Sequence, residues 1–172
     1  MRQLIKNADI FDGTHEALIK NAGIVINDGL IEEISQTHIA EDNFERVIDA
    51  TGLTAIPGLC DMHMHLFFTT SGAQMDTLTL EEICVRSTRF AREVLERGFT
   101  TVRDACGCVF GLKTNIDNGF LPGPRIFPSY ACISQTCGHG DFRTNRAQVR
   151  AGAHSAWRTH FSFYAKRRSC AG

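Results

Sequence analysis

The sequence predicts an α/β protein in which a small β module precedes parallel β/α units. Residues 1–56 contain short apolar runs, alternating polar residues and turn signals, which are typical of β-strands. From Pro57 onward, strand-like segments alternate with helix-like segments, and this order is typical of parallel β/α units. The chain has 172 residues, 43% hydrophobic and 22% charged, so its composition is that of an ordinary globular protein.

The β module is expected to span residues 1–56. The segment GIVINDGLIEEIS, residues 23–35, predicts a hairpin, because Asn27, Asp28 and Gly29 interrupt two apolar runs. Residues 2–11 and 46–56 are further strand candidates. The pair Pro57 and Gly58 then marks the entry into a second part of the chain, residues 57–143.

This second part is expected to contain three strands with helical or loop segments between them. The strands are predicted at residues 59–67, 99–107 and 123–135, with a loop at 69–77 after the first. A helix is predicted from about Leu80 to Arg97. Thr79 is its expected N-cap, and Gly98 is expected to end it.

The first of these strands carries two histidines behind an aspartate, in CDMHMHLFF, residues 60–68. Side chains alternate along a strand, so Asp61, His63 and His65 are expected to share one face. Two imidazoles at this spacing can lean together onto one metal ion, and neutral imidazole suits zinc. The alternative is that neighbouring carbonyl groups satisfy both rings. The spacing alone does not decide between them, because seven histidines can produce it by chance.

Three motifs in order resemble the metal-dependent amidohydrolase superfamily. They are AIPGLCDMHMHL (55–66), GFTTVRDACG (98–107) and GPRIFPSYACISQTCGHGDFR (123–143). The similarity covers roughly residues 1–143 and is strongest to the imidazolonepropionase-related branch, which includes zinc-dependent Xaa-Pro dipeptidases and carboxypeptidases. It implies a (β/α)8 barrel of TIM type, preceded by a small β-sandwich module and incomplete in this chain. The implied chemistry is attack of metal-activated water on an amide, cyclic amide or dipeptide bond.

The resemblance also implies roles for individual residues. His63 and His65 correspond to metal ligands of a one- or two-metal site, with zinc the expected metal, and His139 corresponds to a substrate-side histidine. Asp61 either orients an imidazole through its second N–H or is a structural acid bonded to backbone amides. Asp104, beside Arg103, is expected to form an ion pair or anchor a loop.

The family's later ligands, a lysine, two histidines and an aspartate that also acts as the base, cannot be assigned in this sequence. No catalytic residue is therefore assigned. The isolated chain is expected to hold less than one equivalent of zinc and to be inactive. The alternative is a non-catalytic product of a pseudogene, or a fragment that needs a partner chain.

Residues 144–172 form an atypical basic tail that is predicted not to be native to the fold. From residue 142 to the end there is no Asp or Glu, whereas all 19 acidic residues precede it, and seven of the 18 basic residues lie there. Such a change in composition indicates a boundary, and a shift of reading frame explains it. A third hypothesis, that this tail binds nucleic acid, is weaker because its arginines are scattered.

The net charge, the first residues and the cysteines bear on the partners and the location of the protein. The net charge of −1 does not suggest a partner of opposite charge, so neither nucleic acid nor a membrane is expected as a partner. The first residues do not resemble a signal peptide, and a cytoplasmic location is expected. The seven cysteines are expected to be reduced and mostly buried. A zinc knuckle built from Cys106, Cys108, Cys132 and Cys137 is the alternative.

Overall fold

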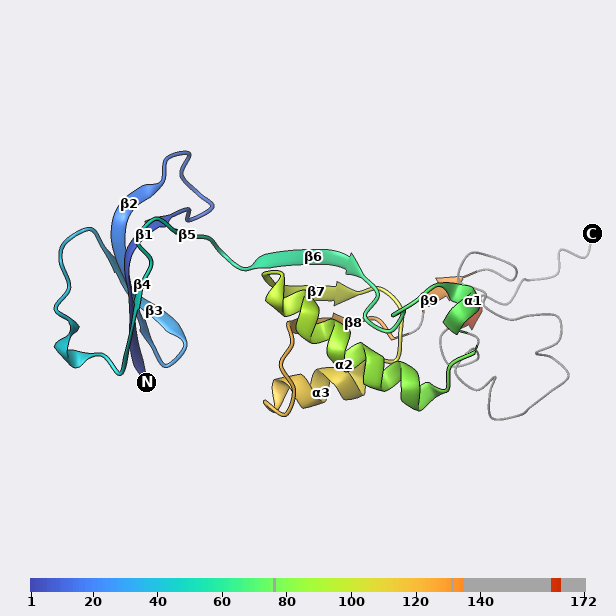
Figure 1. Cartoon of the computed structure of the whole chain (residues 1–172). Helices are drawn as coiled ribbons and strands as arrows, with labels where there is room; N and C mark the ends of the chain where they lie inside the picture. The colour runs from blue at the N-terminus through green and yellow to red at the C-terminus, as the bar shows by residue number, and fades with distance from the viewer. Residues whose placement is uncertain (76, 131, 135–161, 165–172) are drawn as a thin grey trace, which may run out of the picture. The chain divides into compact units, whose positions relative to one another are not determined.

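The computed structural model describes residues 1–75, 77–130, 132–134 and 162–164 (Figure 1). It divides into two compact units, Met1–Pro57 and Gly58–Gly172. The division lies at the pair Pro57 and Gly58, where the sequence predicts that the β module ends.

The first unit is a five-stranded sheet in which β1 occupies the centre. Its strands are β1 (Arg2–Ile10), β2 (Ile19–Asn27), β3 (Leu30–Ser35), β4 (Arg46–Asp49) and β5 (Thr54–Ala55), with a 3-10 turn at Glu41–Asn43. The order is β3-β2-β1-β4, and β5 also pairs with β1. β1 runs antiparallel to β2 and parallel to β4 and β5.

The predicted hairpin is present as β2 and β3. Asn27 pairs with Leu30, so Asp28 and Gly29 form a two-residue turn. Their φ angles are 47° and 81°, and two consecutive positive φ values are those of a type I′ turn, which matches the twist of the strands it joins. The Asp-Gly pair is therefore the local reason why this hairpin forms.

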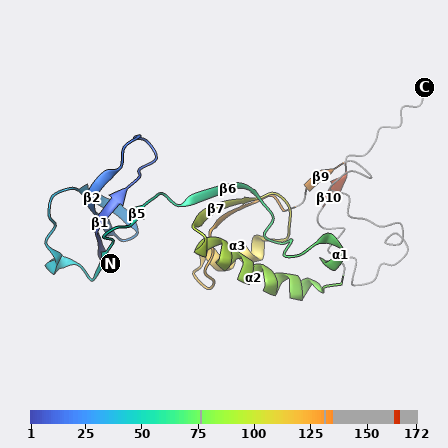
Figure 2. The same ribbon diagram turned by 45° about the horizontal axis from the view of Figure 1, so that its top comes forward.

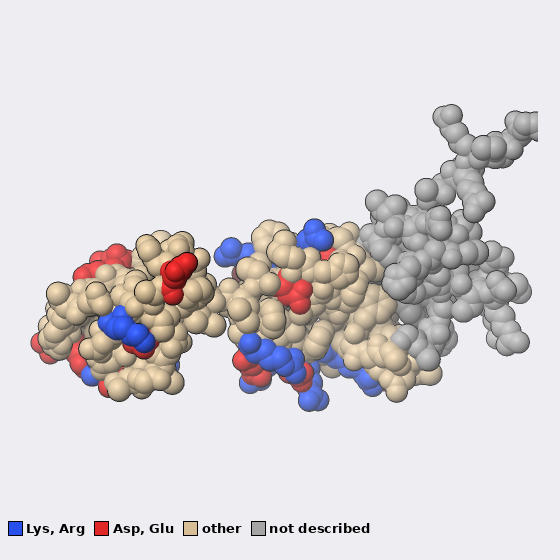
Figure 3. All heavy atoms as spheres, turned by 90° about the horizontal axis from the view of Figure 1, so that it is seen from above, with Lys and Arg blue, Asp and Glu red and all other residues tan. Residues whose placement is uncertain are grey.

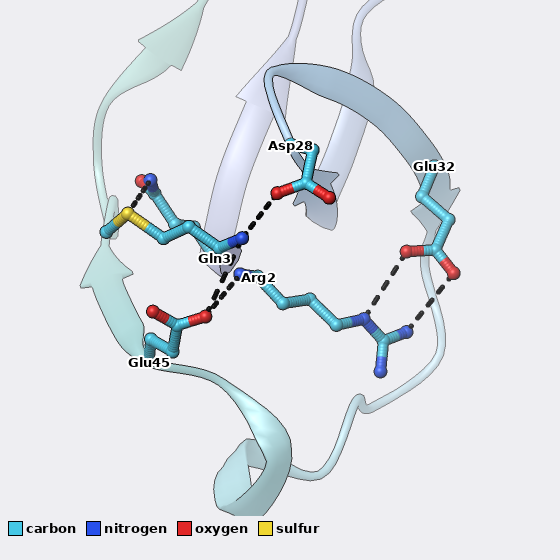
Figure 4. A network of polar contacts seen from close by, with 6 residues as sticks. Arg2, Gln3, Asp28, Glu32 and Glu45 are labelled. Carbon is cyan, nitrogen blue, oxygen red and sulfur yellow. Dashed lines mark hydrogen bonds and ion pairs between the residues drawn. The ribbon is translucent and has the colours of Figure 1, made fainter.

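Small and branched apolar residues form the core of the first unit, and its polar contacts lie at the surface. Ala8, Ile10, Ala22, Ile24 and Ala50 make up the buried cluster. Figure 4 shows the surface network around the start of β1, in which the Arg2 guanidinium donates to Glu32 and the Arg2 amide donates to Glu45. These groups are exposed, so each pair contributes at most about 1 kcal/mol to stability.

The second unit contains the predicted parallel β/α arrangement. Its main elements are β6 (Leu59–Met64), α1 (Gly72–Met75), α2 (Leu80–Glu96), β7 (Phe99–Asp104), α3 (Phe110–Asp117) and β8 (Arg125–Pro128). The three strands lie in the order β6-β7-β8, and both pairings are parallel. α2 and α3 cover the same face of this sheet (Figures 1 and 2).

α2 begins where the sequence predicts it, because Thr79 forms a capping box. The Thr79 hydroxyl accepts from the Glu82 amide, and the Glu82 carboxylate accepts from the Thr79 amide. The helix buries Ile83, Ala91 and Val94 against the sheet. Gly98, with φ of 93°, then supplies the left-handed residue that ends it.

Several boundaries differ from the sequence-based expectation. β6, β7 and β8 end at Met64, Asp104 and Pro128, earlier than predicted, because the chain turns into tight loops there. The expected loop after β6 contains the short helix α1. A further parallel pair joins β9 (Cys132–Ser134) to β10 (Ser162–Tyr164), and β10 lies within the predicted tail.

The cysteines only partly follow the expectation. Cys106 is buried and Cys108 is half-buried, but Cys60 and Cys84 are exposed, so the thiols are not mostly buried in the described part of the chain. The edge position of β6 leaves Cys60 uncovered. Cys137, which the alternative zinc knuckle requires, lies outside the described residues.

In the described residues, the helices are too short or too polar to cross a membrane, and acidic and basic side chains are mixed on the surface. None of the helices described is long and apolar enough to cross a membrane. Along α2, Arg89 pairs with Glu93 at 2.8 Å and Arg92 with Glu96 at 2.7 Å. Figure 3 likewise shows basic and acidic side chains close together on the second unit.

The second unit is expected to self-associate in solution. In the described part of the chain, β6 is an edge strand, and Leu59 and Met62 are 42% and 62% exposed. An exposed apolar edge can pair with a second molecule, and a charge on that edge opposes pairing. We expect the average mass in sedimentation experiments to rise with concentration, and Met62→Lys to reduce this rise.

Val85→Lys is the matched control, because Val85 is 69% exposed on α2 rather than on the sheet edge. An average mass that stays that of a monomer at every concentration would contradict the prediction.

Candidate functional site

The candidate site lies at the carboxyl ends of the parallel strands in the second unit. β6 ends at Met64, directly before His65, while β7 ends at Asp104. In barrels built from β/α units, catalytic groups gather at this end of the strands. The histidines and Asp104 are therefore placed where this fold class carries chemistry.

The two imidazoles of the histidine pair lie close together, edge to face. The ring centroids of His63 and His65 lie 5.1 Å apart, and the ring planes meet at 85°. A zinc–nitrogen bond of about 2 Å puts each ring centroid about 3 Å from the metal, so two tetrahedral ligands have centroids about 5 Å apart. The observed separation is compatible with two ligands of one ion, and it is also that of an ordinary edge-to-face ring pair.

His65 also carries an unsatisfied polar atom. Its Nδ1 is buried and has no hydrogen-bond partner among the described residues. The ring packs edge-on against Phe68, with centroids 5.5 Å apart. A buried ring nitrogen without a partner is costly unless something binds it, and a metal ion is one such group. Within the described residues no carbonyl group satisfies this nitrogen, and the ligand role of the two histidines stays a prediction.

The histidines supply only part of a metal site. In the part of the chain that the structure describes, no three His, Cys, Asp or Glu side chains are grouped so that they could hold an ion. Even catalytic zinc sites use three protein ligands. His63 and His65 therefore fit the metal as two ligands of an incomplete set.

Asp61 acts on the backbone of the histidine strand. Its Oδ1 accepts a hydrogen bond from the His63 amide at 2.9 Å, and neither imidazole is bonded to it. The register of β6 against β7 shifts at this point: Asp61 pairs with Val102, whereas Met64 pairs with Asp104. An extra residue in one strand is a β-bulge, so the strict alternation expected from Asp61 to His65 is interrupted.

Asp104 is the buried acid of the site, where an ion pair or a loop anchor is expected from the sequence. The residue is fully buried, and its Oδ2 accepts from the Leu66 amide at 2.7 Å. Burial raises the pKa of Asp104 from 3.8 to about 6, although the backbone amides of Leu66 and Cys106 lower it in part. Arg103 is exposed, so the structure favours the loop anchor over the ion pair. A polar residue at the end of a buried strand was the available signal.

His139 lies outside the described residues, as do His154 and His160 of the predicted tail. Its substrate-side role therefore stays a prediction. The site that the structure describes consists of the histidine pair, Asp61 and the buried Asp104.

Known proteins similar to this chain include several hydrolases. An ochratoxinase from Aspergillus niger is 30% identical over 132 residues, which cover 72% of this chain but 27% of the relative. A dihydroorotase from Elusimicrobium minutum is 42% identical over 72 residues, covering 38% of this chain and 15% of the relative. The chain thus spans only about a quarter of the length of the first relative.

Solved structures show the same similarity. A prolidase complexed with N-methylphosphonate-L-proline matches with a TM-score of 0.84 and 28% identity, over 97% of this chain and 41% of that protein. A Xaa-Pro dipeptidase with methionine bound in its active site matches with a TM-score of 0.73 and 34% identity, over 82% of this chain and 36% of that protein. The α/β fold predicted from the sequence is therefore confirmed.

A family model described as the amidohydrolase family matches residues 54–165. The matched range includes His63, His65 and Asp104, and it continues past the predicted boundary at residue 143. It covers well over half of the chain. The chain therefore belongs to the amidohydrolase family.

Proposed function

We propose that this chain is part of a metal-dependent hydrolase of carbon–nitrogen bonds, in which His63 and His65 bind a divalent ion, with zinc the expected metal. The observation that carries the proposal is the pair of imidazoles at the carboxyl end of β6, whose ring centroids lie 5.1 Å apart. The buried, unpartnered Nδ1 of His65 supports it.

The metal, when bound, would polarise the scissile carbonyl and lower the pKa of an attacking water. The residues of this chain would hold the metal and orient the substrate. His63 and His65 act as neutral imidazole ligands, and Asp61 fixes the His63 backbone through the 2.9 Å bond. His139 is proposed to donate a hydrogen bond to a carbonyl or carboxylate of the substrate.

The proposed substrates are small molecules with an amide, cyclic amide or dipeptide bond. The prolidase and Xaa-Pro dipeptidase names of the structural neighbours support a dipeptide, while the dihydroorotase name supports a cyclic substrate. A cytoplasmic location is part of the proposal, because the exposed thiols of Cys60 and Cys84 fit a reducing compartment. Nucleic acid is not among the proposed partners.

The second candidate function is a non-catalytic chain, or one that needs a partner to supply further ligands. The absence of a third metal-binding side chain near the histidines, within the described residues, favours it for the chain in isolation. Under both proposals the isolated chain should not hydrolyse amides or dipeptides at a measurable rate.

Zinc binding tests the histidine pair directly. The purified chain should hold well under one equivalent of zinc after dialysis, because two imidazoles bind weakly, and a double variant, His63→Ala with His65→Ala, should abolish the remainder. Elemental analysis and calorimetric titration measure this. His38→Ala is the matched control, since His38 is an exposed histidine of the first unit.

Zinc content unchanged in the double variant would overturn the assignment of His63 and His65. Stoichiometric zinc that the double variant loses would instead show that this chain completes a site by itself.

The boundary near residue 143 is proposed to mark a change of reading frame. Shifting the frame there by one or two nucleotides should restore a continuation of roughly 200 to 250 residues, judged from the size of a barrel. That continuation should carry a lysine, two histidines and an aspartate at strand ends. The repaired protein should bind metal stoichiometrically and hydrolyse an amide or dipeptide, whereas the present chain should hold substoichiometric metal and hydrolyse neither. Stop-rich or unrelated sequence in the other frames would refute the proposal.

A further inference from the structure

Two hydrogen bonds from the end of β7 fix the backbone on both sides of His65. On one side, the Ala105 amide donates to the Met64 carbonyl at 2.8 Å. On the other side, the Leu66 amide donates to Oδ2 of Asp104 at 2.7 Å, in a buried hydrogen bond. Because Met64 and Leu66 are the immediate neighbours of His65, these two bonds fix both peptide groups that carry the histidine.

A close contact one residue further along supports the same loop. A Cβ atom at Gly107 would lie 2.4 Å from Phe67 Cβ and 3.3 Å from Phe67 Cγ. The φ angle of Gly107 is 147°, which also disfavours any side chain there. The Gly107 amide in turn donates to the Tyr130 carbonyl at 2.7 Å, after β8. The segment 104–107 therefore holds the histidine loop on one side and the end of β8 on the other.

We propose that Asp104 is a positioning residue for His65: its carboxylate fixes the Leu66 amide, and thereby the direction in which the His65 imidazole faces His63. The inference rests on the proposed metal-binding function of the pair. β6 itself cannot supply this restraint, because His65 lies one residue beyond its end. A side chain from the neighbouring strand, separated by 38 positions in the sequence, supplies it instead.

The experiment compares Asp104→Ala with Asp104→Asn in the full chain. The asparagine oxygen can still accept from Leu66, whereas alanine cannot. Asp117→Ala and Asp117→Asn are the matched controls, because Asp117 is an exposed aspartate of α3 that pairs with Lys113. Three quantities are measured: the exchange rate of the Leu66 amide, the ring resonances of His63 and His65, and the affinity for Co²⁺ from paramagnetic broadening of those resonances.

We expect Asp104→Ala to speed exchange of the Leu66 amide and to shift the His65 ring resonances more than those of His63. It should also weaken Co²⁺ binding by about 10- to 100-fold, the usual effect of removing a group that supports a metal ligand. Asp104→Asn should retain Co²⁺ affinity within about 3-fold. The Asp117 variants should behave as the unsubstituted chain.

Equal weakening by the alanine and asparagine variants would overturn the inference, because it would make the charge rather than the hydrogen bond responsible. Unchanged His65 resonances and Leu66 exchange in Asp104→Ala would also overturn it, whatever the metal result. If the unsubstituted chain does not bind Co²⁺ at the pair, the proposed function fails, while the ring resonances of metal-free protein still decide the role of Asp104. If Asp104→Ala does not fold, Gly107→Ala is the second variant, because its Cβ would displace Phe67 in the same loop. Ring resonances of His65 that do not shift in Gly107→Ala would then refute the inference.

Discussion

Replacement of Phe67 by alanine is expected to lower the free energy of unfolding of the second unit by about 3–5 kcal/mol, the usual cost of removing a buried phenyl ring. Phe67 is 1% exposed and belongs to the cluster that joins α2, β7 and β8 through Ile83, Val102 and Ile126. Its Cβ also lies against Gly107, so the loop cannot easily collapse into the space left by the ring. Urea denaturation followed by circular dichroism measures the loss.

Phe127→Ala is the matched control for this prediction. Phe127 lies on β8 in the same unit but is 55% exposed, so its replacement should change the free energy of unfolding by only about 0.5 kcal/mol. Equal losses for the two variants would show that the cluster around Phe67 does not stabilise the unit.

The second large effect concerns pH and Asp104. Burial raises the pKa of Asp104 from 3.8 to about 6 in the folded protein. A carboxyl group whose pKa is raised by folding favours the folded state while it is protonated, so its contribution is fully present below about pH 4 and is lost as the pH rises through about 6. Two units of pKa correspond to about 3 kcal/mol.

Comparison with Asp104→Asn isolates this contribution. The free energy of unfolding of the unsubstituted chain minus that of the variant should fall by about 3 kcal/mol between pH 3 and pH 7. Carboxyl groups whose pKa is lowered by hydrogen bonds, such as Asp49 and Asp9, have the opposite pH dependence, but they are present in both proteins and cancel. A difference that stays constant across this range would show that Asp104 does not have a raised pKa.

Local sequence signals predicted the elements that depend on local chemistry. α2 was placed within one residue at its end, because a capping box and a glycine mark its two termini. The β2–β3 hairpin followed from Asp28 and Gly29, which adopt positive φ. The parallel order of β6, β7 and β8 followed from the alternation of strands and a helix.

Features that depend on a partner far along the chain were not predictable in this way. The bulge at Asp61 exists only in relation to β7, so the alternation rule missed it. The bond from Leu66 to Asp104 joins two loops that are distant in sequence. The histidine pair could be proposed from its spacing and from the resemblance, but its ring separation depends on how the chain folds around Met64.

The order of the strands in the second unit has a consequence for how the protein folds during synthesis. β6, β7 and β8 lie in the sheet in the same order as in the chain, with Leu59 beside Phe99 and Thr101 beside Arg125. Each strand that leaves the ribosome therefore docks on one already made, and no strand must wait for a later partner to be inserted between two others. Pairing of parallel strands closes long loops and is slow, but this order lets it begin on the strands already made, from the N-terminal side.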